Sequence, residues 1–167
     1  MKHNSWAAVF ESILQTLCDK ALCVYGDRLV SVAVFGSVGR AAMRPDSDID
    51  MHFVLERLSN GRLKRMAEFQ VLDRLMDPVL REARVQGVST SLSPVLKTPE
   101  EVRLGSPLFL DMVEDARILV DRNGFFRQQI DLLRERLAQL GAKRVWKGNA
   151  WYWDLKPDYR CGEEFEL

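Results

Sequence analysis

The fold is decided by the stretch from Leu29 to Leu55, which reads LVSVAVFGSVGRAAMRPDSDIDMHFVL. One apolar run, Leu29 to Phe35, ends at Gly36-Ser37, and a second, Met51 to Leu55, follows Asp48-Ile49-Asp50. Each run has the length and the β-branched content of a buried strand. The segment between the runs is too short for much more than a turn of helix. We therefore expect two neighbouring strands that present the Gly-Ser turn and the two aspartates side by side.

Asp48 and Asp50 occupy alternate positions at the start of the second strand, so their side chains point to the same face. Paired carboxylates suit Mg²⁺, which takes one or two of them together with waters and phosphate oxygens. Gly36-Ser37 can bring backbone N–H groups close to phosphate oxygens, and Arg40 can neutralise polyphosphate charge. Singly, the aspartates are typical of a solvated strand end and Gly-Ser of an ordinary turn. Their combination favours a metal-nucleotide site.

Composition limits the class of protein. The 167 residues fit one domain with a hydrophobic core. Lys plus Arg number 24 and Asp plus Glu number 24, and this zero formal net charge disfavours a nucleic-acid partner. The cysteines lack the Cys-x-x-Cys spacing of a metal site, and Cys18 is expected to be a buried free thiol. The sequence shows no secretory leader and no apolar run near the roughly 20 residues that span a bilayer, so we expect a cytoplasmic protein without a membrane partner.

Helical and strand patterns alternate along the chain. In order, they predict a helix ending by Gly26, the two strands above, a helix over 63–76 that Pro78 breaks or kinks, a third strand over 88–96, helices from Pro99 and over 107–114, a strand over 117–120 and a last helix over 125–140. This order indicates an α/β (α+β) fold with a small mixed β-sheet flanked by helices. We expect a single domain over residues 1–167, with an aromatic-rich tail from about residue 143.

The segment FGSVGRAAMRPDSDIDMHFVL, from Phe35 to Leu55, resembles the motif of the minimal nucleotidyltransferases, small members of the DNA polymerase beta-like nucleotidyltransferase superfamily. The resemblance implies a nucleotidyltransferase-like fold in which Gly36 and Ser37 hold the nucleotide phosphates. It also implies that Asp48 and Asp50 are the catalytic residues and bind Mg²⁺. The close match covers little more than this segment.

The activity that the resemblance implies is Mg²⁺-dependent transfer of a nucleoside monophosphate from a nucleoside triphosphate, AMP from ATP in our interpretation. We expect Arg40 and Ser47, which lie between the motif elements, to contact the nucleotide as well. The sequence does not identify the acceptor, although small members of the family act on partner proteins that include HEPN-type toxins. A polymerase or a tRNA nucleotidyltransferase is disfavoured because little chain remains for a template- or tRNA-holding domain.

The chain departs from the family at the third carboxylate, which relatives carry on a later strand. The segment from Val88 to Val95 contains serines and a threonine but no acid. Glu100 and Glu101 follow it, but acids in the first turn of a helix are explained by the helix dipole. The alternative interpretation is therefore a catalytically weak or inactive module that binds a nucleotide or a partner on the same fold. The two intact aspartates oppose this alternative.

Other polar and aromatic residues have simpler interpretations. His52 alternates with Asp50 and could reach the site, but a histidine on the strand surface is favoured. Trp151 and Trp153 in the tail would share one strand face, which favours packing over stacking on nucleic-acid bases. Three acidic residues near Met112 are expected to form the solvated side of a helix: Asp111, Glu114 and Asp115.

Overall fold

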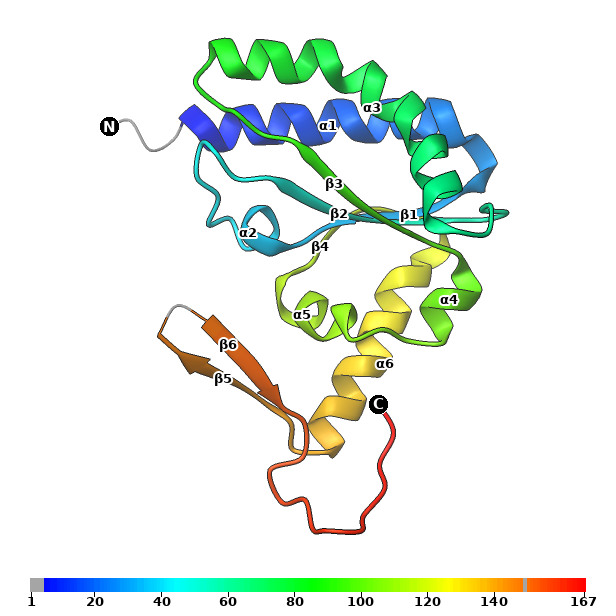
Figure 1. The fold of residues 1–167 in the computed structure, drawn as a ribbon, viewed down its shortest axis with the longest axis vertical. Coiled ribbons are helices and arrows are strands. Elements are labelled where there is room, and N and C mark those ends of the chain that lie inside the picture. The colour runs from blue at the N-terminus through cyan, green and yellow to red at the C-terminus, as the bar shows by residue number, and fades with distance from the viewer. Residues whose placement is uncertain (1–4, 149) are drawn as a thin grey trace.

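The structure is a computed structural model that describes residues 5–148 and 150–167. A four-stranded sheet lies between two layers of helices, and a two-stranded hairpin lies beyond one of these layers (Figure 1). The elements in chain order are α1 (Ser5–Tyr25), the 3-10 helix η1 (Gly26–Arg28), β1 (Leu29–Val34), α2 (Gly36–Gly39), β2 (Ile49–Leu55), α3 (Arg62–Val85), β3 (Leu92–Lys97), α4 (Pro99–Arg103), α5 (Leu108–Asp115), β4 (Arg117–Asp121), the 3-10 helix η2 (Arg122–Gly124), α6 (Phe125–Gln139), β5 (Lys143–Lys147) and β6 (Ala150–Asp154).

The sheet is mixed, with strand order β3-β2-β1-β4. β1 is antiparallel to β2 and to β4, whereas β2 and β3 are parallel. Parallel neighbours need a crossover connection, and α3 supplies it between β2 and β3. The predicted fold class, a small mixed sheet flanked by helices, is confirmed.

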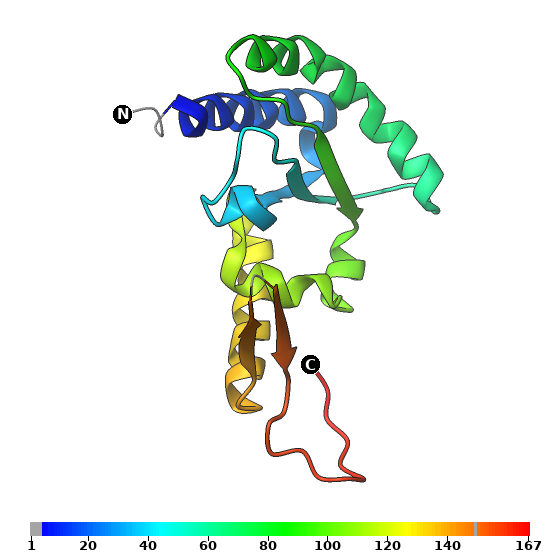
Figure 2. The same ribbon diagram turned by 60° about the vertical axis from the view of Figure 1, so that its left-hand side comes forward.

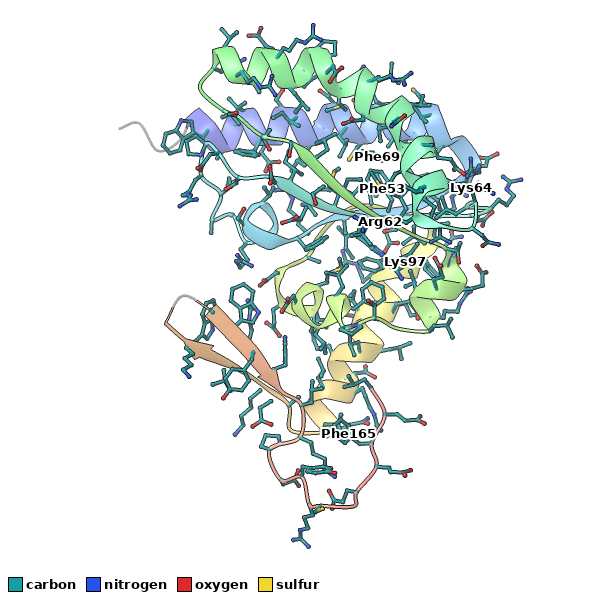
Figure 3. All side chains as sticks on the ribbon, viewed as in Figure 1. Phe53, Arg62, Lys64, Phe69, Lys97 and Phe165 are labelled. Atoms are coloured by element: carbon teal, nitrogen blue, oxygen red, sulfur yellow. The ribbon has the colours of Figure 1, made fainter. Side chains whose placement is uncertain are left out.

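The long helices α1 and α3 cover one face of the sheet (Figure 2). Phe53 of β2 and Phe69 of α3 lie together in this layer, with ring centroids 5.7 Å apart (Figure 3). Pro78 lies inside α3 and does not end it, so of the expected break or kink the break is wrong. Met76 and Leu80 on either side of it are buried, and this packing supports the helix across the hydrogen bond that proline cannot make.

β3 begins at Leu92, later than predicted. The residues before it pair with the loop that leads into β2: the Ser89 amide donates to the Pro45 carbonyl over 2.7 Å, and the Ile49 amide donates to the Ser91 carbonyl over 2.9 Å. Residues 88–91 are thus bound to the entry of β2 before regular strand pairing starts. Within residues 5–148 and 150–167, no helix has both the length and the apolar character needed to cross a bilayer.

α5 and α6 cover the other face of the sheet, and His52 is part of that core. Its imidazole is fully buried, with its centroid 4.8 Å from the Phe126 ring and 5.2 Å from the Phe109 ring. The expectation of a surface histidine is wrong, because strand alternation places His52 on the same face as Val54, which these helices cover. Burial, with a smaller effect of the Lys97 charge, lowers the pKa of His52 to about 3.

We predict that His52 makes the protein sensitive to acid. Between pH 6.5 and 3 the unfolded chain binds a proton on this imidazole and the folded chain does not. Its contribution should therefore lower the free energy of unfolding by up to about 1.4 kcal/mol for each unit that the pH falls in this window. Urea denaturation across the window should show a shallower pH dependence for His52→Leu than for the wild type. His3→Gln, the control at the other histidine, should keep the wild-type slope, and equal slopes for all three proteins would contradict the prediction.

Candidate active site

The end of β1 and the start of β2 bring Gly36 against Asp50. Val34 is opposite Met51 in the antiparallel pair, and the Phe35 amide donates to the Asp50 carbonyl over 3.1 Å. Gly36 has a φ of +64°, and a Cβ at this position would lie 2.4 Å from Asp50 Oδ2. Only glycine satisfies both the left-handed backbone and this close approach. The turn of helix α2 therefore starts directly against the carboxylate, as the sequence predicts.

The carboxylates of Asp48 and Asp50 differ in their environment. Asp48 is exposed, whereas Asp50 is half-buried. Burial raises the pKa of Asp50 above its ordinary value, and the negative charge of Asp48 raises it further. The Ser93 hydroxyl and the Arg40 charge act in the opposite direction. The two carboxylates are thus close enough to repel each other, which a bound cation would relieve.

Serine hydroxyls lie beside both aspartates. Asp50 is opposite Ser93 in the parallel pair of β2 and β3. The Ser91 hydroxyl donates to Asp48 Oδ1 over 2.7 Å. Among the described residues, no group of three or more His, Cys, Asp or Glu side chains could hold a metal. The start of β3 and the residue before it therefore supply serine, and no carboxylate, to both aspartates.

Glu101 is engaged elsewhere, as expected for a residue in the first turn of a helix. It completes a capping box with Thr98, in which the Glu101 amide donates to Thr98 Oγ1 over 3.3 Å and Glu101 Oε2 accepts from the Thr98 amide over 2.9 Å. The same carboxylate pairs with Arg65 over 2.7 Å. These contacts explain this glutamate through the start of α4 rather than through the site.

Arg40 and Ser47 each have partners within the protein. Arg40 pairs with Asp115 over 2.7 Å, and its guanidinium lies 4.8 Å from the centre of the Trp151 ring. The Ser47 hydroxyl accepts from the Arg44 amide over 2.8 Å, so it shapes the loop before Asp48. Arg40 is nevertheless close enough to Asp50 to lower the pKa of that carboxyl. Contact of Arg40 and Ser47 with a nucleotide stays a prediction.

Asp115 is a buried carboxylate that contacts arginines from both the motif and the C-terminal hairpin. In addition to its ion pair with Arg40, it accepts two hydrogen bonds from Arg144, at 2.9 and 3.1 Å. Gly39 lets α2 pack closely against the end of α5, because a Cβ on this glycine would lie 2.3 Å from the Asp115 carbonyl oxygen. The expected solvated helix side is therefore wrong for Asp115, since β5 and α2 cover the end of α5.

The tail forms the hairpin β5–β6, which lies on the same side of the sheet as α5 (Figure 1) and is hydrogen-bonded to it. Asp111 Oδ1 accepts a hydrogen bond from the Trp151 indole over 2.8 Å and from the Trp153 indole over 3.3 Å. The Arg144 guanidinium lies 4.2 Å from the centre of the Trp151 ring, a favourable cation–π arrangement. Packing of the two tryptophans is thus confirmed. The strand pair itself was missed, although Arg144 and Trp146 on β5 alternate in the same way and could have revealed it.

The donor set fits one Mg²⁺ ion held jointly by the protein and a polyphosphate. Asp48 is exposed, and its negative charge is close enough to raise the pKa of Asp50. Gly36 has no side chain, so no Cβ crowds the carboxylate of Asp50. Mg²⁺ commonly takes only one or two carboxylates and completes its octahedron with phosphate oxygens and waters. Two aspartates are therefore sufficient for one such ion.

The sequence model of the nucleotidyltransferase domain family matches residues 11–120, which are most of this chain. The chain therefore belongs to the nucleotidyltransferase domain family, and it is a transferase of this class. The resemblance inferred from the motif is confirmed.

Individual relatives are more distant. The protein named "Putative protein adenylyltransferase MJ1305", from Methanocaldococcus jannaschii, is 27% identical over 128 residues, which cover 75% of this chain and 82% of that protein. A toxin–antitoxin crystal structure with AMP-PNP is 18% identical, with a TM-score of 0.45 over 76% of this chain and 92% of that chain. A tri-AMPylated Shewanella oneidensis HEPN toxin in complex with MNT antitoxin gives 16% identity and a TM-score of 0.41 over 77% and 92% of the respective chains.

We predict that Gly36→Ala is more damaging than the same change at a glycine with equal backbone strain. Gly141 has a φ of +66°, and its Cβ would meet no atom within 4 Å. Both variants should lose about 1–2 kcal/mol of unfolding free energy from the left-handed backbone. Gly36→Ala should lose about 1 kcal/mol more, because its Cβ displaces the Asp50 carboxylate. Urea denaturation measures the difference, and equal losses would show that the close approach to Asp50 has no energetic effect.

We also predict that Asp115→Ala loosens the hairpin. Removing this carboxylate leaves the guanidiniums of Arg40 and Arg144 without their shared partner, which should lower the free energy of unfolding by about 3–5 kcal/mol. Asp131→Ala removes an exposed pair with Arg134 and should change it by less than about 1 kcal/mol. Urea denaturation can be followed by tryptophan fluorescence, since three of the four tryptophans lie in the hairpin. Similar midpoints for the two variants would refute the role given to Asp115.

Proposed function

We propose that this protein transfers AMP from ATP, in a Mg²⁺-dependent reaction, to a hydroxyl group of a protein acceptor. The contact of the Gly36 turn with the Asp50 carboxylate carries this proposal, because it sets the backbone that we propose binds phosphate beside the paired aspartates. The family supports transfer of a nucleotidyl group. The name of the Methanocaldococcus jannaschii relative supports adenylyl as the group and a protein as the acceptor. A HEPN-type toxin is the acceptor that the motif resemblance suggests.

Asp48 and Asp50 would hold the Mg²⁺ ion, which when bound neutralises phosphate charge and the charge of the leaving pyrophosphate. The backbone N–H groups at Gly36 and Ser37 would orient the phosphates. Arg40 is close enough to Asp50 to lower the pKa of its carboxyl, and it would add positive charge beside the phosphates. The Ser47 hydroxyl shapes the loop that leads to Asp48, and Ser47 is proposed to contact the nucleotide.

The second candidate is a nucleotide-binding or partner-binding module with weak or no turnover. Ser91 and Ser93, in the segment where the motif resemblance implies an acid, favour it, because a hydroxyl is a much weaker base and metal ligand than a carboxylate. The paired aspartates favour the enzyme, because burying part of Asp50 beside Asp48 is unfavourable without a cation. Labelling separates the two candidates: with α-labelled ATP and cell extract, the enzyme labels a protein and the module labels none.

We predict that Asp48→Asn combined with Asp50→Asn lowers the Mg²⁺-dependent affinity for ATP at least about tenfold, or 1.4 kcal/mol. The fold should persist, because Asp50 is half-buried beside the charge of Asp48 and the neutral amides remove that repulsion. Isothermal titration calorimetry with and without Mg²⁺ measures the effect. Asp46→Asn, an exposed aspartate of the same loop, is the matched control and should bind as the wild type does. Unchanged affinity in the double variant would remove the metal assignment.

A further inference from the structure

An exposed serine hydroxyl lies against one of the two aspartates of this site. The Ser91 hydroxyl donates to Asp48 Oδ1 over 2.7 Å, and both residues are exposed. This hydrogen bond fixes the Ser91 oxygen beside the carboxylate at which Mg²⁺–ATP is proposed to bind. The Asp48 carboxylate therefore faces both the place proposed for ATP and a nucleophile from its own chain.

The backbone holds this hydroxyl in place. The Ile49 amide donates to the Ser91 carbonyl over 2.9 Å, and Ile49 is opposite Leu92 at the start of the parallel pair. Ser91 and Asp48 each directly precede one of these paired residues, so strand pairing sets the spacing of their side chains. Such fixed placement is what converts a reaction between two molecules into one within a single molecule.

The neighbouring hydroxyls are less suited to the role. Thr90 is buried, with 4% of its surface exposed, and its hydroxyl donates to the Ser47 carbonyl over 2.7 Å. Ser93 lies opposite Asp50, a half-buried carboxylate with Gly36 against one of its oxygens. Ser91 alone combines an exposed hydroxyl with an exposed carboxylate partner among these three residues.

We propose that Ser91 is itself an acceptor and that the protein adenylylates its own Ser91. This inference rests on the function proposed above and adds a modification site to it. Ser91 Oγ attacks the α-phosphorus of ATP and forms a new P–O bond, while the bond from that phosphorus to the oxygen bridging to the β-phosphate breaks. Pyrophosphate leaves with that oxygen, and the hydroxyl proton is lost to solvent, to which Ser91 is exposed. The product is AMP joined to Ser91 through a phosphodiester.

The modification would limit further turnover. AMP on Ser91 places a negative phosphodiester and a nucleoside beside Asp48, where the next Mg²⁺–ATP would have to bind. Repulsion between like charges and the occupied space both oppose that binding. The modified fraction should therefore show no measurable Mg²⁺-dependent affinity for ATP.

The test is to incubate purified protein with ATP and Mg²⁺, then measure its intact mass and map the modified peptide. The wild type should gain one adenylyl group on Ser91. Ser91→Ala should gain none, whereas Ser91→Thr, which restores a hydroxyl, should be modified at residue 91. Ser89→Ala, an exposed serine two residues earlier, is the matched control and should be modified at Ser91 as the wild type is. Circular dichroism checks that each variant is folded.

The rate provides a second measurement. Because Ser91 faces Asp48 of the same chain, the first-order rate constant should not change over a tenfold dilution of the protein. A rate constant that rises with protein concentration, or a mass gain that persists in Ser91→Ala, would overturn the proposal.

Failure of this inference can be told apart from failure of the proposed function. A wild type that binds Mg²⁺–ATP and labels a protein in extract, but gains no mass itself, refutes self-modification alone. A wild type that does not bind Mg²⁺–ATP refutes both.

Discussion

The active-site motif depends on one close contact, between the backbone of Gly36 and the carboxylate of Asp50. The antiparallel pairing of β1 and β2 puts the end of one strand beside the start of the other, and the missing Cβ lets the turn descend onto the carboxylate. Gly39, one helical turn later, makes a similarly close approach to the Asp115 carbonyl, which a Cβ would prevent. Two glycines thus set how closely α2 approaches β2 on one side and α5 on the other.

The contact with α5 extends the motif beyond the segment that the family model matches. Arg40 directly follows α2, Asp115 is the last residue of α5, and Arg144 lies on the hairpin, outside residues 11–120. Two guanidiniums around one buried carboxylate leave an excess of one positive charge, which the faces of nearby tryptophan rings help to stabilise. The orientation of Arg40 is therefore set by the C-terminal part of the chain.

Much of the fold could be predicted from the sequence, because periodicity reports which face of an element is apolar. The helices, the first two strands and the Gly-Ser turn follow from such local patterns. The burial of His52 and the pairing of Asp115 could not be predicted, because both depend on which helices and strands pack over these residues. Asp115 and Arg144 lie far apart along the chain, and no local pattern reports that they meet. The hairpin had a usable signal in its alternating aromatic residues, but its short strands carry little apolar periodicity.

The sequence by itself predicted that Asp48 and Asp50, at alternate positions where a strand begins, lie beside a Gly-Ser turn, because side chains alternate along an extended chain. It also determined that the next strand brings no acid. Only the tertiary structure decided what stands in the place of that acid. The register of a parallel pair depends on the whole βαβ unit, including the packing of α3, and is not encoded in either strand alone. That register places the Ser91 hydroxyl against Asp48, so it decides which side chains can take part in chemistry at this site.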